Sequence, residues 1–221
     1  TSYLDALHRE IAMVAALLPA SARVRRIAFG GGSPNAIHPT DFVRLMDTLL
    51  LHFPLEDPLI SIELDPRTLT ADWGAVIGGV GATHASLGVQ TFDHALQLAI
   101  GREQPLEMIE NSVEILRKAG ITSLNFDLMY GLPGQTHAEL DASLDHTTRL
   151  GANRIALFGY AHVPHLIPRQ KRIDGTNLPG QDERFQMALH GYERLTRGGY
   201  EAVGFDHFAL PGDPLAQAAL G

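Results

Sequence analysis

The chain has 221 residues, with 17 Lys or Arg against 25 Asp or Glu, which gives a formal net charge of −8. Its 45% apolar and 19% charged residues are typical of a globular protein with a buried core, and not of a disordered chain. The acidic balance argues against a nucleic-acid partner, no apolar run is long enough for a membrane span, and the first residues do not resemble a signal peptide, so we expect a cytoplasmic protein. The sequence has no cysteine, which excludes disulfides, thiol catalysis and Cys-ligated metal or iron–sulfur centres among these 221 residues.

Helices and strands are predicted to alternate along the chain. The first element is an amphipathic helix, because apolar residues follow one another at steps of three or four: Leu4, Leu7, Ile11, Val14 and Leu18. Similar stripes predict a helix between Pro105 and Gly120 (Ile109, Val113 and Leu116) and another over Gln181–Arg197 (Phe185, Leu189, Tyr192 and Leu195). Strands are expected at Arg26–Phe29, Leu59–Leu64, His84–Gln90, Ser123–Met129 and Arg154–Tyr160. No linker interrupts this order, so we expect a single domain over residues 1–221.

The strands carry polar side chains at every second position. In the second strand Ser61, Glu63 and Asp65 share one face, while Ile62 and Leu64 share the other. The third and fourth strands alternate in the same way. Parallel strands between two helical layers are normally apolar on both faces. A wide, incomplete barrel with a polar interior accounts for the pattern, whereas an antiparallel sheet with one solvent-exposed face remains the alternative.

Several loops carry residues suited to ligand binding. The Gly30–Pro34 segment can bring bare backbone close to a ligand, although a plain turn explains it equally well. Asp127 lies in an apolar context, where a carboxylate needs a partner, either a ligand or a structural ion pair. Arg102 alone reads as a surface residue. His162 and His165 are separated by Pro164, which breaks a helix, and no third ligand has a suitable spacing, so no metal site is predicted.

Taken together, these segments resemble the oxygen-independent coproporphyrinogen III oxidases, which are radical S-adenosylmethionine enzymes. The similar stretches run in the same order as in the family and cover nearly the whole chain: Phe29–Pro34, Ser61–Arg67, Ser86–Gln90, Arg102–Gln104, Asn125–Pro133, Tyr160–Pro164 and Gly204–Ala209. The resemblance implies an incomplete (β/α)6 TIM-like barrel of the radical SAM type that binds a [4Fe-4S] cluster and two S-adenosylmethionine molecules. It also implies a reaction: a 5′-deoxyadenosyl radical removes a hydrogen from a propionate β-carbon of coproporphyrinogen III, and loss of carbon dioxide leaves a vinyl group. Two such events give protoporphyrinogen IX.

The resemblance also implies site residues. Gly31 and Glu63 match contacts to the first S-adenosylmethionine, whereas the second is matched by Gly32, Ser33, Gln90, Arg102, Asp127 and Ala161. No catalytic residue is matched. The substrate carries four propionates, and the basic residues Arg169, Lys171 and Arg172 are candidates for binding them. A solvent-exposed basic turn would have the same sequence, so this assignment is weaker than that of the cofactor contacts. We further expect an electron donor as partner and a monomeric protein.

The sequence departs from the family in one serious respect. The family holds its cluster with a Cys-x3-Cys-x2-Cys motif, and this chain has no cysteine. We therefore expect an internal segment of a longer enzyme, without the first barrel strand, the cluster-binding part and the C-terminal helical domain, and inactive alone. Two alternatives stay open: a haem-binding chaperone of the same superfamily, which typically lacks the Tyr160–Pro164 and Asp206–Ala209 segments, and a cluster-free scaffold.

Overall fold

The computed structural model describes residues 2–220, which divide into two compact units. The first unit holds the chain up to Ala85 together with Ile115–Thr122, and the second holds Ser86–Glu114 together with the chain from Ser123 onward. None of the helices within residues 2–220 combines the length and the apolar character needed to cross a bilayer.

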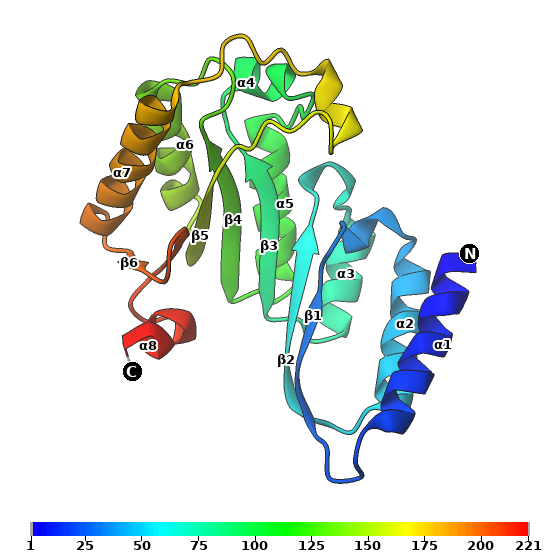
Figure 1. Ribbon diagram of the computed structural model, residues 1–221. Helices are drawn as coiled ribbons and strands as arrows, with labels where there is room; N and C mark the ends of the chain where they lie inside the picture. The colour runs from blue at the N-terminus through cyan, green and yellow to red at the C-terminus, as the bar shows by residue number, and fades with distance from the viewer. Residues whose placement is uncertain (1, 221) are drawn as a thin grey trace. The chain divides into compact units, whose positions relative to one another are not determined.

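The first unit packs helices against a pair of parallel strands (Figure 1). In chain order it contains α1 (Ser2–Leu17), β1 (Val24–Phe29), the short helix η1 (Pro34–Ala36), α2 (Pro39–His52), β2 (Leu55–Leu64), η2 (Pro66–Thr68) and α3 (Ala71–Gly79). Strand β1 pairs with β2 so that Phe29 lies beside Ile62. The core forms where the Phe42 ring contacts those of Phe29 and Trp73, at centroid distances of 4.7 and 5.1 Å.

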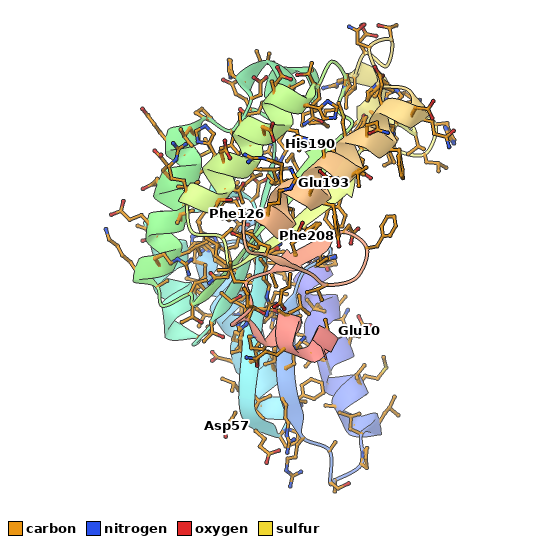
Figure 2. The ribbon with its side chains drawn as sticks, turned by 90° about the vertical axis from the view of Figure 1, so that its left-hand side faces the viewer. Glu10, Asp57, Phe126, His190, Glu193 and Phe208 are labelled. Carbon is orange, nitrogen blue, oxygen red and sulfur yellow. The ribbon has the colours of Figure 1, made fainter. Side chains whose placement is uncertain are left out.

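The second unit adds antiparallel strands to a parallel pair. Its elements are β3 (His84–Gln90), α4 (His94–Ala99), α5 (Leu106–Lys118), β4 (Ser123–Tyr130), α6 (His137–Arg149), β5 (Arg154–Gly159), η3 (Pro168–Arg172), α7 (Gln181–Arg197), β6 (Glu201–Ala202), β7 (His207–Ala209) and α8 (Pro214–Leu220); β3 and α5 cross the boundary between the units. Strands β4 and β5 are parallel, whereas β7 pairs antiparallel with both β5 and β6. Phe126 and Phe208 fill the interior, and His190 and Glu193 mark α7 (Figure 2).

The predicted α/β fold is confirmed. All five predicted strands are present, and the third has the predicted ends. The alternative of an antiparallel sheet is wrong for β1 with β2 and for β4 with β5. The sequence did not predict the short strands β6 and β7. The incomplete barrel with a missing first strand, and the single domain, stay predictions.

The alternation of polar and apolar side chains is also confirmed, with one correction. In β3, Ala85, Leu87 and Val89 are buried while the residues between them are half-exposed. In β2, Ile62 and Leu64 are buried and Glu63 is exposed. Asp65, expected on the polar face with Glu63, is instead buried after the strand ends, where its carboxylate binds Arg67 and caps η2. A backbone that turns at the strand end no longer follows the period of two.

The apolar stripe predicted for Gln181–Arg197 is wrong at three of its four residues, and only Leu195 is buried as predicted. Helix α7 has the predicted ends, but it buries Met187, Gly191 and Leu195, leaving Phe185, Leu189 and Tyr192 exposed. The reason is Gly191, because its bare backbone lies so close to Leu157 of β5 that a Cβ there would overlap the leucine side chain. The stripe predicted for α5 is confirmed, since Ile109, Val113 and Leu116 are buried.

Candidate functional site

In the first unit, the loop after β1 lies on the carboxylate of Glu63. The backbone N–H of Gly31 donates a 3.3 Å hydrogen bond to Glu63 Oε2, and a Cβ on Gly30 would stand 2.7 Å from the Glu63 carboxyl carbon. Gly31 has a φ of 78°, a left-handed conformation that favours glycine. The predicted pair Gly31 and Glu63 is therefore brought together, in a form that requires glycine at residues 30 and 31.

A buried asparagine holds this loop against the end of β2. Asn35, which is 3% exposed, donates from Nδ2 to the backbone oxygen of Asp65 at 2.8 Å and accepts from the Asp65 N–H at 3.0 Å. The two hydrogen bonds fix the distance between the end of β1 and the end of β2, so Glu63 stays beside the glycines. Gly32 and Ser33 lie between these fixed points and are exposed.

The same loop borders a cavity within the first unit. Its volume is about 560 Å³, which is in the range of small-molecule sites. The lining is mostly apolar and comes from α1, β1 and α2, with the whole of Gly30–Pro34 at its edge.

In the second unit, Gln90 ends β3 in a strained conformation. Its φ is 70°, and its buried Oε1 has no hydrogen-bond partner among residues 2–220. A non-glycine residue in the left-handed region costs energy and persists where the surroundings or a function require it. Beside it, Arg102 Nη2 donates a 3.1 Å hydrogen bond to the backbone oxygen of Gly88. From the sequence alone, Arg102 could be a surface residue. The structure instead places its side chain against the backbone near the end of β3.

Two buried glutamines fix the turn that carries Arg102. Gln97 donates from Nε2 to the backbone oxygens of Thr91 and Gln104, at 3.0 and 2.8 Å, and accepts from the Gln104 N–H. Gln104 in turn donates to the backbone oxygen of Val89 at 2.8 Å. Both side chains are at most 1% exposed. Nothing in the sequence pattern reveals their burial, because a glutamine beside a turn has no local signature of a buried residue.

Asp127 lies in a polar cluster on β3 and β4. Its Oδ2 accepts from the Ser86 hydroxyl at 2.9 Å, and its Oδ1 accepts from Asn125 Nδ2 at 2.7 Å. Asn125 also donates to the Ser86 oxygen at 2.8 Å. These are the polar positions of the two strands, so the alternation seen in the sequence places all three side chains on one face.

The loop after β5 is held by Gln170. This buried side chain accepts from the Val163 N–H at 2.6 Å and donates to the backbone oxygen of Ala161 at 2.8 Å, which orients the backbone of Ala161. Tyr160 shares a 3.0 Å hydrogen bond with His162 Nδ1, and burial raises the pKa of its hydroxyl. Arg169 and Arg172 are exposed and three residues apart on η3, where side chains at that spacing align.

The predicted site residues thus fall into two groups. Gly31, Gly32, Ser33 and Glu63 lie at the strand ends of the first unit. In the second unit Gln90 and Ala161 lie at or next to strand ends, Asp127 lies within β4, and Arg102 lies in the turn between α4 and α5. Buried carboxamides that no sequence pattern indicates orient most of these loops: Asn35, Gln97, Gln104 and Gln170. Each group by itself offers polar contacts to a ligand: the first has a carboxylate and bare glycine backbone, and the second has a carboxylate, a carboxamide and a guanidinium.

The chain is similar to a known family and to several known proteins. Residues 5–147 match the family model of the Radical SAM superfamily. The chain is 41% identical over 219 residues to an oxygen-independent coproporphyrinogen III oxidase of Cereibacter sphaeroides, covering 99% of this chain and 48% of that protein. It is 40% identical over 200 residues to the uncharacterized protein y4hJ of Sinorhizobium fredii, covering 90% of this chain and 77% of that protein.

A solved structure agrees with these sequence relatives. Coproporphyrinogen III oxidase (HemN) from Escherichia coli, described as a Radical SAM enzyme, superposes with a TM-score of 0.93 at 37% identity, over 98% of this chain and 50% of that one. The chain therefore spans about half the length of the oxidases it matches. Sequence and fold together show that this chain belongs to the Radical SAM superfamily.

Proposed function

We propose that the protein containing this chain carries out the oxygen-independent decarboxylation of coproporphyrinogen III to protoporphyrinogen IX, in porphyrin and haem biosynthesis. The proposal extends to this chain the activity named for its relatives. The observation that carries it is the glycine loop laid on the Glu63 carboxylate, where Gly30 leaves no room for a Cβ.

S-adenosylmethionine fits the residues of both groups. The Glu63 carboxylate can accept hydrogen bonds from an amino or ribose group, and the bare backbone of Gly31 and Gly32 allows close approach. In the second unit the partnerless Oε1 of Gln90 offers an acceptor and Arg102 a cation. When bound, S-adenosylmethionine supplies the radical chemistry of this reaction. We propose two such molecules, the first held by Gly31 and Glu63, and the second by Gly32, Ser33, Gln90, Arg102, Asp127 and Ala161.

An iron–sulfur cluster does not fit these 221 residues. Clusters of the [4Fe-4S] type are held by cysteine thiolates, and the chain contains no cysteine. In our proposal the thiolates belong to a part of the protein outside this sequence, as does the helical C-terminal domain. We also propose that an electron donor serves the enzyme and that it acts as a cytoplasmic monomer.

Binding to the chain itself gives the most direct test. Isothermal titration with S-adenosylmethionine should show binding by the wild-type chain, weakened at least tenfold in Glu63→Gln. Gln is nearly isosteric with Glu but carries no charge. The unfolding temperature of the Glu63→Gln variant should therefore match that of the wild type. No binding by a folded wild-type chain would contradict the proposal.

A second assay separates the alternatives. The complete gene product, assayed without oxygen, should convert coproporphyrinogen III to protoporphyrinogen IX, as measured by chromatography after oxidation. A haem-binding chaperone would instead bind haem tightly without this conversion. A scaffold without a cluster would do neither.

A further inference from the structure

Arg184, in the first turns of α7, has an unused guanidinium. It is half-buried, and among residues 2–220 its side chain forms no hydrogen bond and no ion pair. Arginines elsewhere on α7 are paired: Arg194 binds Asp141 and Asp145, and Arg197 binds Glu193. A partly desolvated cation without an anion is unfavourable, and in a chain with a net charge of −8 it is unexpected.

The guanidinium converges with a tyrosine hydroxyl over a bare glycine. A Cβ on Gly159, the last residue of β5, would lie 3.0 Å from the Tyr130 hydroxyl oxygen and 3.2 Å from Arg184 Nη2. Gly159 is the register partner of Tyr130, the last residue of β4. Among residues 2–220 the Tyr130 hydroxyl also forms no hydrogen bond. Two donors without acceptors thus point at the same space.

The stem of the arginine is supported by a second glycine. A Cβ on Gly131 would lie 3.5 Å from Arg184 Cγ and 3.6 Å from its Nε, so the side chain lies along the backbone at the end of β4. Gly131 has a φ of 77°, which disfavours any other residue. The site is therefore built from backbone that cannot easily gain side chains, with a planar fork of donors held above it.

The pair lies next to the predicted cofactor contacts of the same unit. The backbone N–H of Tyr160 donates to the backbone carbonyl oxygen of Tyr130 at 2.8 Å, and Ala161 follows Tyr160 directly. From this placement we propose that Arg184 and Tyr130 form a carboxylate-binding site over Gly159. Arginine binds carboxylates through two parallel hydrogen bonds, and the tyrosine hydroxyl adds a third donor.

Two carboxylates in the proposed reaction have the required chemistry, and to this extent the inference rests on the proposed function. One is a propionate of the tetrapyrrole, and the other is the amino-acid carboxylate of S-adenosylmethionine. Neither source is needed for the first test, because a small carboxylate is enough to probe the site.

That first test uses sodium propionate as the probe. In the 15N-labelled chain, propionate should shift the amide resonances of Gly131 and Gly159 saturably, whereas the neutral isostere propionamide should not. Arg184→Gln should weaken propionate binding at least tenfold, and Tyr130→Phe should weaken it less. Arg197→Gln, an exposed arginine of the same helix, should change nothing. The inference is overturned if Arg184→Gln binds propionate as the wild type does, or if the wild type shows no response.

A second titration identifies the source of the carboxylate. If Arg184→Gln weakens binding of coproporphyrin III at least fivefold and leaves S-adenosylmethionine unchanged, the site holds a propionate; the reverse result assigns it to the cofactor. If both affinities are unchanged, the assignment to this reaction is overturned. A wild-type chain that responds to propionate but binds neither larger ligand would instead contradict the proposed function and leave the carboxylate site standing.

Discussion

The carboxylate of Glu63 occupies the place where a side chain on Gly30 would begin, because a Cβ there would stand 2.7 Å from the Glu63 carboxyl carbon. Gly30→Ala should therefore push Glu63 aside while leaving the fold intact, since Glu63 is exposed and its far end is flexible. We expect the affinity for S-adenosylmethionine to fall about tenfold, the size of one lost charge-assisted hydrogen bond, with an unfolding temperature within a few degrees of the wild type.

Calorimetry and circular dichroism measure these two quantities. Gly212→Ala is the matched control, because its Cβ would meet open space. In a Glu63→Ala background, Gly30→Ala should have no further effect on affinity. A loss of the same size in that background would show that Gly30 acts independently of Glu63.

Asp127 should matter for ligand binding more than for folding. Asp127→Asn keeps the volume but replaces one acceptor with a donor that faces the donors Ser86 and Asn125. We expect affinity for S-adenosylmethionine to fall at least tenfold and the unfolding temperature to fall by less than about 5 °C, equivalent to one or two kcal/mol for a chain of this size. Asp57→Asn is the control, an exposed aspartate shown in Figure 2. A large loss of stability with unchanged affinity would make Asp127 a structural residue.

Arg169 and Arg172 offer a test of long-range attraction to the substrate. Replacing both with Gln should raise the apparent KM of the complete gene product for coproporphyrinogen III several-fold, because the substrate carries up to four negative charges. The wild-type KM should rise with salt more steeply than that of the variant, since exposed charges are screened within about 10 Å at 0.1 M salt. Arg44→Gln on α2 is the control. Unchanged KM and salt dependence would leave η3 as an ordinary surface turn.

The ion pair of Arg154 with Asp213 predicts a pH dependence of stability. Burial raises the pKa of Asp213, but hydrogen bonds from Arg154, the Leu215 N–H and Ser123 outweigh it, so the pKa lies below its usual range. A depressed folded-state pKa contributes stability above the unfolded value of about 3.9, and this contribution is lost as the pH falls through the folded value.

Asp213→Asn should thus lower the free energy of unfolding by about 2 kcal/mol at pH 7, and the difference from the wild type should shrink below about pH 4. Urea unfolding at pH 7, 5 and 3 measures this. Asp182→Asn, on the exposed start of α7, should show a much smaller change at each pH. A constant difference over the whole pH range would mean that the pair contributes through packing and not through charge.

The sequence by itself determined the features that depend on local spacing. The ends of β3, the buried face of α5 and the polar face of β4 follow from periods of 2 and 3.6 residues, because the backbone repeats at those periods wherever an element continues. The glycine loop and Glu63 were also recognisable, since their residue types recur in the family.

The tertiary structure alone decided the features that depend on distant residues. Asp65 is held inward by hydrogen bonds with Asn35 of another element, and α7 presents Gly191 to the sheet because Leu157 fills the space. The burial of Gln97, Gln104 and Gln170, and the convergence of Arg184 with Tyr130, likewise arise from contacts between separate elements. The local sequence sets the periodic position of a side chain, but its partners come from elsewhere in the fold. The polar residues that orient the site therefore show no local sequence pattern.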